Sequence, residues 1–350
     1  MDLNNLFEAA VLAANYTEVA SNRIPYLGEG LFPAAKKAGL DLKWIKGNKG
    51  LPISLMPSAF DAQATYRDRI GISKLETEMP FFREGFKMKE KDRQDIMRAQ
   101  DSNDPYVQSV LNFIFDDTYQ LVEGAMVAAE RMRMQLLFPV SGGPNIAIQA
   151  NGVDYTYNYD VDESWATNNR FTLTDTALWS ATSTSDPMAN MDTVKTAILN
   201  ATGTELRVAI MNSVTFNWMI QSTALQNRWL AVNGRAIGYL TKNELRQAFE
   251  AATGVRVAVY DKQYKNESGV AAKFVPDGLV AMVPDGAIGN TWYGTTPEEA
   301  DGVNTALVNT GVSLTTVKIP HPVNTNIIAS EIVLPSYERM DEVALLKVLA

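Results

Sequence analysis

Apolar residues recur with helical spacing over the longest uninterrupted stretch of the chain, residues 104–138. They return every three or four positions from Val107 to Leu136, the period of an amphipathic helix. Asp104 is a good N-cap and Pro105 suits the first helical position, so we predict one helix of roughly 50 Å. A rod packed on a sheet is favoured over a coiled coil, because the period is helical rather than a strict heptad.

Gly124 lies in the middle of this predicted helix, where a glycine costs about 1 kcal/mol relative to alanine. Two explanations fit it: close packing against a neighbour, or a bend point of the helix used in a conformational change. Arg131 and Arg133 lie near the C-terminal end, where cations suit the helix dipole.

Alternating apolar and polar positions predict strands on both sides of the long helix. Residues 40–47 and 51–58 alternate and predict a hairpin, and residues 145–161 predict another around the turn Asn151–Gly152. Residues 2–15 predict a short amphipathic helix, with Ala10 and Ala14 on its apolar side. Residues 28–33 read as a turn-rich connection.

Helical and strand patterns then alternate, which predicts a compact α/β unit at roughly 190–320. Its predicted helices are 191–203, 215–230 and one that opens with a capping box at Thr241–Glu244; its predicted strands are 205–211, 255–261 and 279–283. A strand at 326–336 and a short helix at 337–349 complete the chain. The fold class is therefore α+β.

Charge and composition exclude several classes of protein. The chain has 40 acidic and 31 basic residues, which argues against tight nucleic-acid binding and against anionic membrane surfaces. No run of about 18 apolar residues occurs, so no membrane span is expected, and the first residues do not resemble a signal peptide. The absence of cysteine excludes disulfides and thiolate metal sites.

No catalytic, cofactor or metal site is predicted. The single histidine, His321, lies between two prolines, and neither a nucleophile elbow nor a phosphate-binding loop occurs. Adjacent acids are typical of solvated surfaces; the pairs are Asp116/Asp117, Asp160/Asp162 and Glu298/Glu299. A long chain of this kind without an active site favours a structural building block.

Residues 61–94 form the most charged part of the chain, with alternating signs and too little apolar material for a core. They are either a solvated, flexible loop or an extended arm that pairs charges with a neighbouring subunit. The aromatic pair Phe81–Phe82 favours the arm, because exposed aromatic pairs usually meet a partner surface. The candidate assembly residues are Trp44, Arg67, Arg69, Lys74, Glu76, Glu78, Phe81, Phe82 and Arg83.

The order of these parts resembles the major capsid proteins of tailed bacteriophages in the lambda protein E family. The resemblance is carried by residues 30–47, 51–84 and 276–299 together with the long helix. It implies the Hong Kong 97-type capsid fold and a structural protein rather than an enzyme. It also implies self-assembly as hexamers and pentamers into an icosahedral shell that encloses double-stranded DNA.

The resemblance implies five segments: an N-terminal arm at 1–39, an extended loop at 40–90, a peripheral domain at 91–189 containing the spine helix, an axial domain at 190–320, and a return strand with C-terminal segment at 321–350. The expected partners are copies of the chain, a portal protein and packaged DNA held without specific binding. No segment remains for a fused scaffold, so a separate scaffolding protein is expected; a decoration protein stays open. The expected location is the virion capsid, after assembly in the cytoplasm of the bacterial host.

Two other classes also lack a recognisable catalytic site. A tail tube or portal subunit would assemble as tubes or rings. A carbohydrate-binding or hydrolytic β protein would use exposed tryptophans as sugar platforms, and the candidates are Trp165, Trp179, Trp229 and Trp292.

Overall fold

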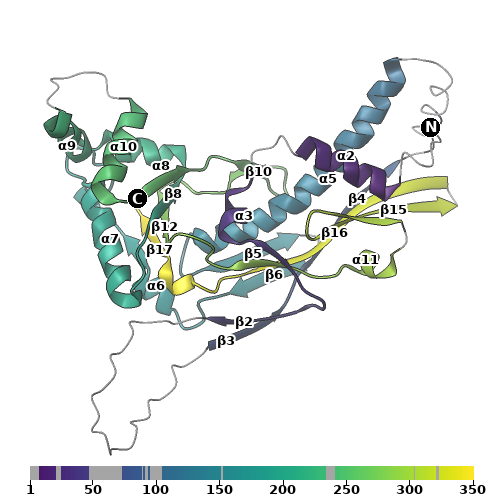
Figure 1. Ribbon diagram of the computed structural model, residues 1–350, viewed down its shortest axis with the longest axis horizontal. Coiled ribbons are helices and arrows are strands. Elements are labelled where there is room, and N and C mark those ends of the chain that lie inside the picture. Colours follow the sequence, from purple (N-terminus) through teal and green to yellow (C-terminus); the bar gives the residue numbers. More distant parts are fainter. Residues whose placement is uncertain are drawn as a thin grey trace, which may run out of the picture. The chain divides into compact units, whose positions relative to one another are not determined.

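The computed structural model describes residues 8–20, 25–46, 73–88, 90, 94, 105–150, 153–233, 241–302, 304–320 and 323–350 (Figure 1). The chain divides into two compact units. Unit 1 comprises Met1–Lys43, Glu76–Arg133 and Gly289–Ser336, and unit 2 comprises Trp44–Leu75, Met134–Ile288 and Tyr337–Ala350. The division falls inside the long helix α5 (Pro105–Leu137), which confirms the helix predicted from the apolar period.

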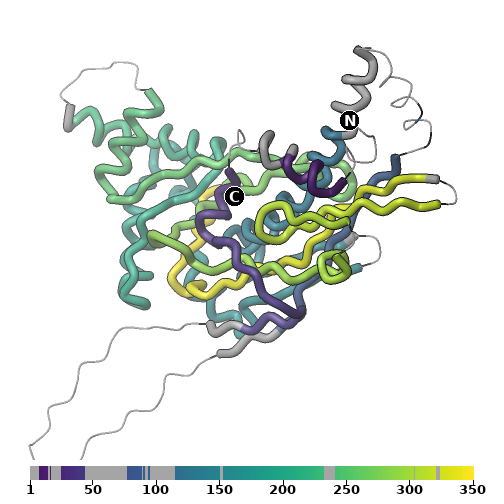
Figure 2. The backbone as a smooth tube through the Cα atoms, turned by 45° about the vertical axis from the view of Figure 1, so that its right-hand side comes forward, coloured from purple at the N-terminus to yellow at the C-terminus, as the bar shows by residue number. Residues whose placement is uncertain are grey.

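Unit 1 is built on a six-stranded sheet whose central strand, β16, is 14 residues long. The strands are β1 (Ala34–Lys36), β13 (Asn290–Tyr293), β16 (Val323–Ser336), β15 (Val312–Pro320), β14 (Thr305–Val308) and β4 (Phe81–Met88). Along one side β16 pairs with β15, the long pair that is yellow-green in Figure 2, and along the other it pairs with β4 and then β13. Strands from two distant parts of the sequence, β4 and β13, therefore meet along one side of β16. The helices of this unit are α2 (Ala9–Ala20), α3 (Leu27–Leu31), α11 (Pro297–Asp301) and the first part of α5.

Unit 2 contains a five-stranded sheet with helices packed on it. The strands, in sheet order, are β7 (Arg170–Thr172), β17 (Ala344–Lys347), β12 (Leu279–Val283), β8 (Val208–Met211) and β9 (Arg256–Val259). The helices are α6 (Ser164–Asn168), α7 (Pro187–Thr202), α8 (Ser213–Gln221), α9 (Thr223–Asn233) and α10 (Lys242–Thr253), with short 3₁₀ turns η1 (Asp175–Ala177) and η2 (Met340–Glu342). Two hairpins complete it, β5 (Asn145–Ala150) with β6 (Val153–Asn158) and β10 (Gln263–Lys265) with β11 (Ala271–Lys273).

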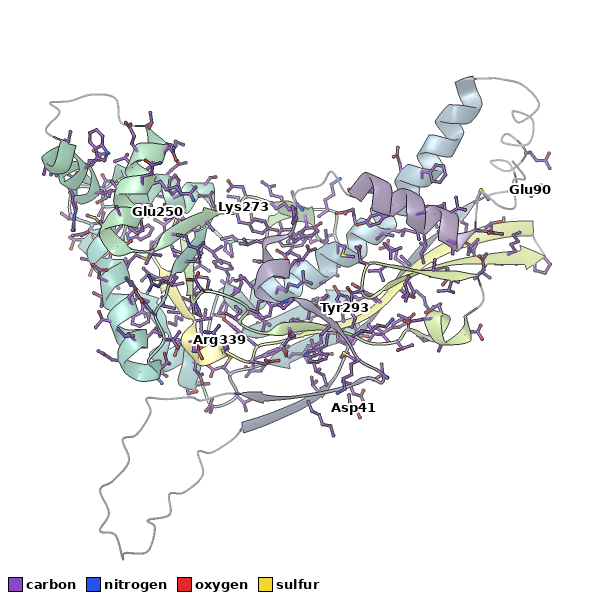
Figure 3. The ribbon with its side chains drawn as sticks, in the orientation of Figure 1. Asp41, Glu90, Glu250, Lys273, Tyr293 and Arg339 are labelled. Atoms are coloured by element: carbon purple, nitrogen blue, oxygen red, sulfur yellow. The ribbon has the colours of Figure 1, made fainter. Side chains whose placement is uncertain are left out.

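The core of unit 2 is a continuous apolar cluster. All five residues of β12 are buried, as expected for a strand with neighbours on both sides and helices on its sheet. Side chains such as Met191, Phe249 and Leu346 are at most 1% exposed in this cluster. Arg339, labelled in Figure 3, fixes η2 by donating to Glu342 (Nε–Oε2 2.8 Å) and to the carbonyl of Ala287 (3.0 Å).

Helix signals read from the sequence are confirmed in unit 2. The capping box of α10 is formed in both directions between Thr241 and Glu244, and Gly254 ends the helix in the left-handed region. Gly203 ends α7 in the same way. The hairpin β5–β6 places Ala150 opposite Val153, which confirms the hairpin predicted around Asn151–Gly152.

Other predictions were wrong where distant pairing decides the structure. Residues 28–33 contain the short helix α3 rather than turns alone. Residues 215–230 form two helices, which break at Ser222 because its buried hydroxyl donates to the carbonyl of Ser185 (2.8 Å). The predicted C-terminal helix is instead β17, whose residues pair with β12 and β7 and are almost all buried.

Helix α2 overlaps the helix predicted at 2–15 and buries another face. α2 starts at Ala9 and buries Ala9, Leu12 and Tyr16, whereas Ala10 and Ala14 are exposed. Residues 1–7 lie outside the described part of the chain.

The observed units also differ from the predicted segment boundaries. Residues 289–320, expected in the axial domain, contribute β13, β15 and β14 to the sheet of unit 1, because they pair with β16 or with one another. Residues 134–189, expected in the peripheral domain, belong to unit 2, and so does the C-terminal segment.

The region predicted as an extended loop contains three described strands. β2 (Asp41–Lys46) pairs with β3 (Ser73–Glu78) in a separate two-stranded sheet, and β4 follows in unit 1. The predicted strand at 51–58 lies outside the described residues, as does His321. In the ranges that are described, no helix is long and apolar enough to span a membrane.

Candidate assembly elements and a buried charged cluster

The structure brings together only part of the predicted assembly set. Phe81, Phe82 and Arg83 are consecutive on β4, where both aromatic side chains are half-buried. Glu78 is exposed at the end of β3. Trp44 lies in β2, and Lys74 and Glu76 lie in β3, but these three side chains are outside the described part. Arg67 and Arg69 are outside it altogether.

Arg83 has a partner within its own chain. Its guanidinium forms an ion pair with Glu298 on α11 and lies 4.8 Å from the centre of the Phe81 ring. Lys36 of β1 pairs with the neighbouring acid, Glu299. This ion pair joins β4 to α11, and the predicted contact of Arg83 with another subunit stays a prediction.

A chain of hydroxyl groups positions Glu298 for this contact. Thr296 is the N-cap of α11 and accepts from the backbone N–H of Glu299 (3.2 Å). The Thr296 hydroxyl lies 2.6 Å from that of Ser313, which lies 2.9 Å from the Ser330 hydroxyl. Ser330 donates to Oε2 of Glu298 (2.9 Å). Because all three hydroxyl residues are buried, with Ser313 on β15 and Ser330 on β16, they fix the carboxylate that receives Arg83.

A buried ion pair lies at the centre of unit 1. Glu130 and Arg133 of α5 are 0% and 3% exposed, and Nη1 of Arg133 lies 3.2 Å from Oε2 of Glu130. Arg133 also donates to Oγ1 of Thr291 (2.9 Å) and to the hydroxyl of Tyr293 (3.5 Å), which Figure 3 labels. The backbone N–H of Gly28 donates to Glu130 (3.0 Å). This buried charged cluster, as we call it, joins α3, α5 and β13.

Position 28 must be a glycine, because α3 lies very close to α5 at this point. A Cβ built on Gly28 would lie 2.4 Å from Oε2 of Glu130 and 2.7 Å from Cδ of Arg133. Both neighbours are buried and held by hydrogen bonds, so neither can move away cheaply. The predicted role of Arg133 at the helix dipole is therefore wrong: its charge is used by a buried pair.

Glu331 on β16 adds a further buried carboxyl to the cluster. It is 1% exposed, and within the described part of the chain neither of its carboxyl oxygens has a hydrogen-bond partner. Burial raises the pKa of Glu331 to about 8, although the charge of Arg133 opposes the shift. Burial and then the charge of Glu331 raise the pKa of Tyr293 to about 12. Glu331 is consequently protonated at neutral pH, and the net charge of the cluster stays small.

The cluster could have been suspected from the sequence. Glu130 and Arg133 are spaced i, i+3, and they fall among the apolar positions Ala129, Met132 and Leu136 that face the core. Charged residues on the apolar stripe of a helix need a buried partner. The identity of the partners on β13 and α3 could not be read from local spacing.

Gly124 lies on the exposed side of α5. A Cβ at this position would meet no atom within 4 Å, so close packing inside the described chain does not explain the glycine. The bend point remains a proposal.

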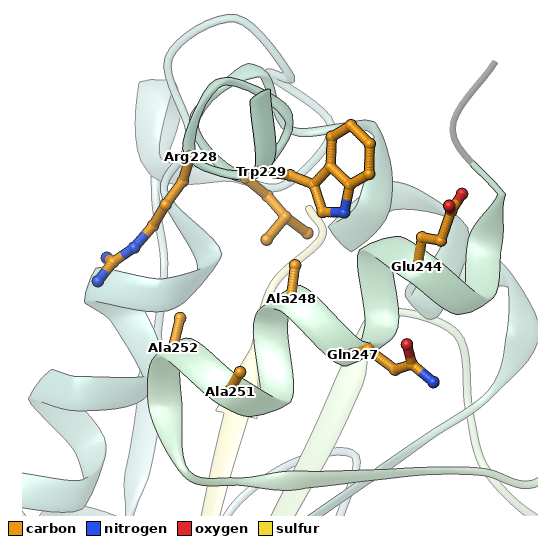
Figure 4. Close-up of a pocket in the computed structure, with 8 residues that line it drawn as sticks. Arg228, Trp229, Glu244, Gln247, Ala248, Ala251 and Ala252 are labelled. Atoms are coloured by element: carbon orange, nitrogen blue, oxygen red, sulfur yellow. The ribbon is translucent and has the colours of Figure 1, made fainter. Parts of the chain in front are cut away.

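An open groove lies between α9 and α10 in unit 2 (Figure 4). Its volume is about 570 Å³, and Ala248, Ala251 and Ala252 line it on α10. Trp229 and Arg228 line it on α9. The carboxylate of Glu244 at its edge is already used by the capping box.

The described side chains also weaken the carbohydrate alternative. Trp165 and Trp179 are 1% and 0% exposed, so neither can stack on a sugar ring. The indole of Trp292 donates to the hydroxyl of Ser336 (3.0 Å). Among the described residues, no group of three or more histidines and acids could hold a metal ion.

Comparisons with known structures identify the fold. A putative prophage capsid protein from E. coli CFT073 is 14% identical, with a TM-score of 0.60 over 98% of this chain and 99% of that one. A phage-related protein from Bordetella bronchiseptica RB50 is 14% identical, with a TM-score of 0.57 over 97% and 96% of the two chains. The capsid protein of cyanophage A-1(L) is 12% identical, with a TM-score of 0.52 over 99% of each.

At these identities the similarity establishes the fold, which is the α+β Hong Kong 97-type fold of phage capsid proteins. A sequence search among curated proteins gives no match. A family model described as phage major capsid protein E matches residues 8–348, nearly the whole chain. The chain therefore belongs to the phage major capsid protein E family and is a major capsid protein of a phage.

Proposed function

We propose that the chain assembles as hexamers and pentamers into an icosahedral shell around double-stranded DNA. The supporting observation is the family match over residues 8–348, together with the capsid fold. The protein then acts through association rather than turnover, in the virion capsid, after assembly in the cytoplasm of its host. Shell contacts can each be weak, because many act together on one subunit.

The two units suggest how the segments divide this work. Unit 2 would supply the axial domain through the α/β core of residues 187–283, and unit 1 would supply the peripheral sheet with α5 as its spine. Residues 1–39 would act as the N-terminal arm. The span between β2 and β3, which includes Arg67 and Arg69, would reach over a neighbouring subunit.

Partner proteins follow from this proposal. A separate scaffolding protein would direct closure, a portal protein would occupy one vertex, and a decoration protein stays open. The net charge of −9 favours packaged DNA that is enclosed without specific binding, because an acidic wall repels phosphates.

Negative-stain electron microscopy tests the proposal. The purified chain would be imaged after expression with and without the scaffold gene of the same phage. Closed icosahedral particles are expected, whereas tubes or rings would favour a tail or portal subunit. Monodisperse monomers under both conditions would contradict the proposal.

The role of the extended loop has its own test. The double substitution Arg67→Ala and Arg69→Ala should leave folded subunits but prevent shells, because it removes charges proposed to pair with a neighbour. Deletion of β4 would not be informative, because its eight residues pair with β16. Arg256→Ala, which removes an exposed pair with Asp285 in unit 2, serves as the matched charge control. Normal shells from the double variant would contradict the role.

The proposed bend of α5 at Gly124 is tested by measuring how shells expand rather than how the subunit folds. If the helix bends at Gly124 during expansion, Gly124→Ala should give precursor shells that expand poorly. Expansion at the rate of the parent chain would exclude the bend point.

A further inference from the structure

The N-terminal part of the chain lies against α5 on both sides of Gly124. Helices α2 and α3 both contact α5 (Figure 1). The hydroxyl of Tyr16 on α2 donates to Oε1 of Glu123 (2.9 Å), and the hydroxyl of Tyr26, directly before α3, donates to Oε2 of the same carboxylate (2.9 Å). Both tyrosines are buried. Two separate parts of the N-terminal segment therefore hold the residue next to Gly124.

Two further contacts extend this interface along α5. The ring of Tyr16 packs against the ring of Tyr119, with the ring centres 5.3 Å apart. The backbone N–H of Gly28 donates to Glu130 (3.0 Å). The contacts on α5 run from Tyr119 to Glu130, about 16 Å along the helix axis. Gly124 lies between them, so the N-terminal segment bridges this position.

Both ends of the bridging segment are fixed within unit 1. Before α2 continues, the backbone N–H of Ala9 donates to Oδ1 of Asn304, directly before β14 (3.3 Å). After α3, the hydroxyl of Thr291 on β13 donates to the carbonyl of Phe32 (2.9 Å). A segment that is anchored at both ends and holds α5 in between resists a change in the direction of the helix.

Gly124 is the position at which α5 gains most by opening. A glycine lacks a Cβ, so its backbone recovers more freedom than that of any other residue when a helix opens. Within the described residues, a Cβ at Gly124 would meet no atom within 4 Å, so no neighbour supports the helix on that side. The helix is nevertheless continuous from Pro105 to Leu137. The support that bridges Gly124 comes from the contacts at Glu123 and along the same part of α5.

We propose that α2, Tyr26 and Gly28 form a splint that holds α5 as one helix across Gly124 and is released before the helix bends there. These residues are called the N-terminal splint. The inference rests on the bend at Gly124 proposed above and adds the element that controls it. Bending then depends on the hydroxyls of Tyr16 and Tyr26 as well as on the glycine.

Hydrogen exchange of isolated subunits, followed by mass spectrometry, tests the splint without shells. The double substitution Tyr16→Phe and Tyr26→Phe removes both hydroxyls of the splint but keeps the rings. Peptides that cover residues 119–130 should exchange about tenfold faster, because a helix opens more often where its contacts are lost. The double substitution Tyr155→Phe and Tyr157→Phe on β6 of unit 2 is the matched control and should leave these peptides unchanged.

A double-mutant cycle with Gly124→Ala distinguishes a splint from ordinary packing. Alanine supports the helix through its own propensity, so the two hydroxyls should matter less in that background. The acceleration of exchange should therefore fall from about tenfold to about twofold or less. Equal acceleration in both backgrounds would contradict the splint. No acceleration, or an acceleration spread evenly over all peptides of unit 1, would contradict it as well.

Shell expansion then separates the splint from the proposed bend. Precursor shells of the Tyr16→Phe and Tyr26→Phe variant should expand faster than those of the parent chain, because the splint no longer has to be released. If exchange responds as expected but Gly124→Ala shells expand at the rate of the parent, the bend fails and the support that the splint gives to α5 stands. If exchange does not respond, the splint fails, and the bend is decided by Gly124→Ala alone.

Discussion

The two units of the chain both bury apolar side chains, but they differ in the charged groups that they bury. Unit 2 buries a continuous apolar cluster under capped helices. Unit 1 buries apolar side chains such as Val333 and Leu334 and, in addition, the ion pair of Glu130 and Arg133 with the carboxyl of Glu331 nearby. Apolar burial is non-directional, whereas a buried ion pair is favourable only in the geometry that satisfies both partners.

Apolar burial stabilises a unit without requiring one exact arrangement, whereas the buried ion pair does require one. In unit 1 the cluster fixes α3 on α5 through Gly28, and α5 on β13 through Thr291. We infer that unit 1 depends on a few exact contacts and that unit 2 depends on total apolar volume. In the proposed shell, these exact contacts between α5 and β13 would give every copy of the subunit the same geometry.

The largest expected effect is the loss of Arg133. Arg133→Ala should destabilise unit 1 by about 3–5 kcal/mol, because Glu130 is left charged and buried without its partner. Hydrogen exchange followed by mass spectrometry measures this in peptides from α5 and β13. Arg246→Ala, which removes a half-exposed pair with Glu250 in unit 2, is the control and should cost about 0.5 kcal/mol. Equal effects of the two variants would remove the contrast between the units.

Glu331 should make the stability of unit 1 depend on pH. Its folded-state pKa of about 8 lies above the ordinary value, so its contribution is present below the unfolded pKa and is lost as pH rises through 8. Between about pH 5 and pH 8, the free energy of unfolding should fall by up to ~1.4 kcal/mol per pH unit.

Glu331→Gln should remove that slope, since the amide does not titrate. Hydrogen exchange of variant and parent at the same pH cancels the intrinsic pH dependence of exchange, and peptides from unit 2 give the reference. A slope in unit 1 that survives the substitution would assign the pH dependence to another group.

The core of unit 2 should tolerate a change of shape. Met282 is fully buried on β12, and Met282→Leu keeps its volume, so the cost should stay below about 1.5 kcal/mol. Urea unfolding followed by far-UV circular dichroism measures it. A loss as large as that of Arg133→Ala would mean that unit 2 also depends on exact contacts.

The smallest effect is expected at Gly124. Its surroundings are open, so Gly124→Ala should stabilise α5 by up to about 1 kcal/mol through helix propensity alone. Thermal unfolding of isolated subunits is the measurement, with the exposed Ala10→Gly in α2 as a change of opposite sign. If Gly124→Ala instead lowers the melting temperature, the space beside Gly124 is occupied in the isolated subunit.

Sequence patterns predicted the elements that local signals determine better than those that distant pairing determines. Helix caps such as Thr241 and Gly254 and the hairpin turn Asn151–Gly152 act over a few residues, so local spacing reveals them. The strand β17 was read as a helix because its apolar run fits both periods, and only its pairing with β12 and β7 decides the matter.

The candidate site shows the same limit. Arg83 was predicted to meet another subunit, and its ion pair with Glu298 could not be foreseen, because Glu298 lies more than 200 residues away in sequence and no local rule links them. Arg133 was assigned to the helix dipole because its buried partners come from β13 and α3. Contacts of this kind depend on the order of strands in a sheet, which spacing along one chain does not encode.

The central claim is that this chain builds a closed shell from copies of itself. A cryo-electron microscopy reconstruction of particles purified from the chain and its scaffold tests it most directly. The account predicts an icosahedral wall of hexamers and pentamers. A helical tube or an isolated ring would contradict it.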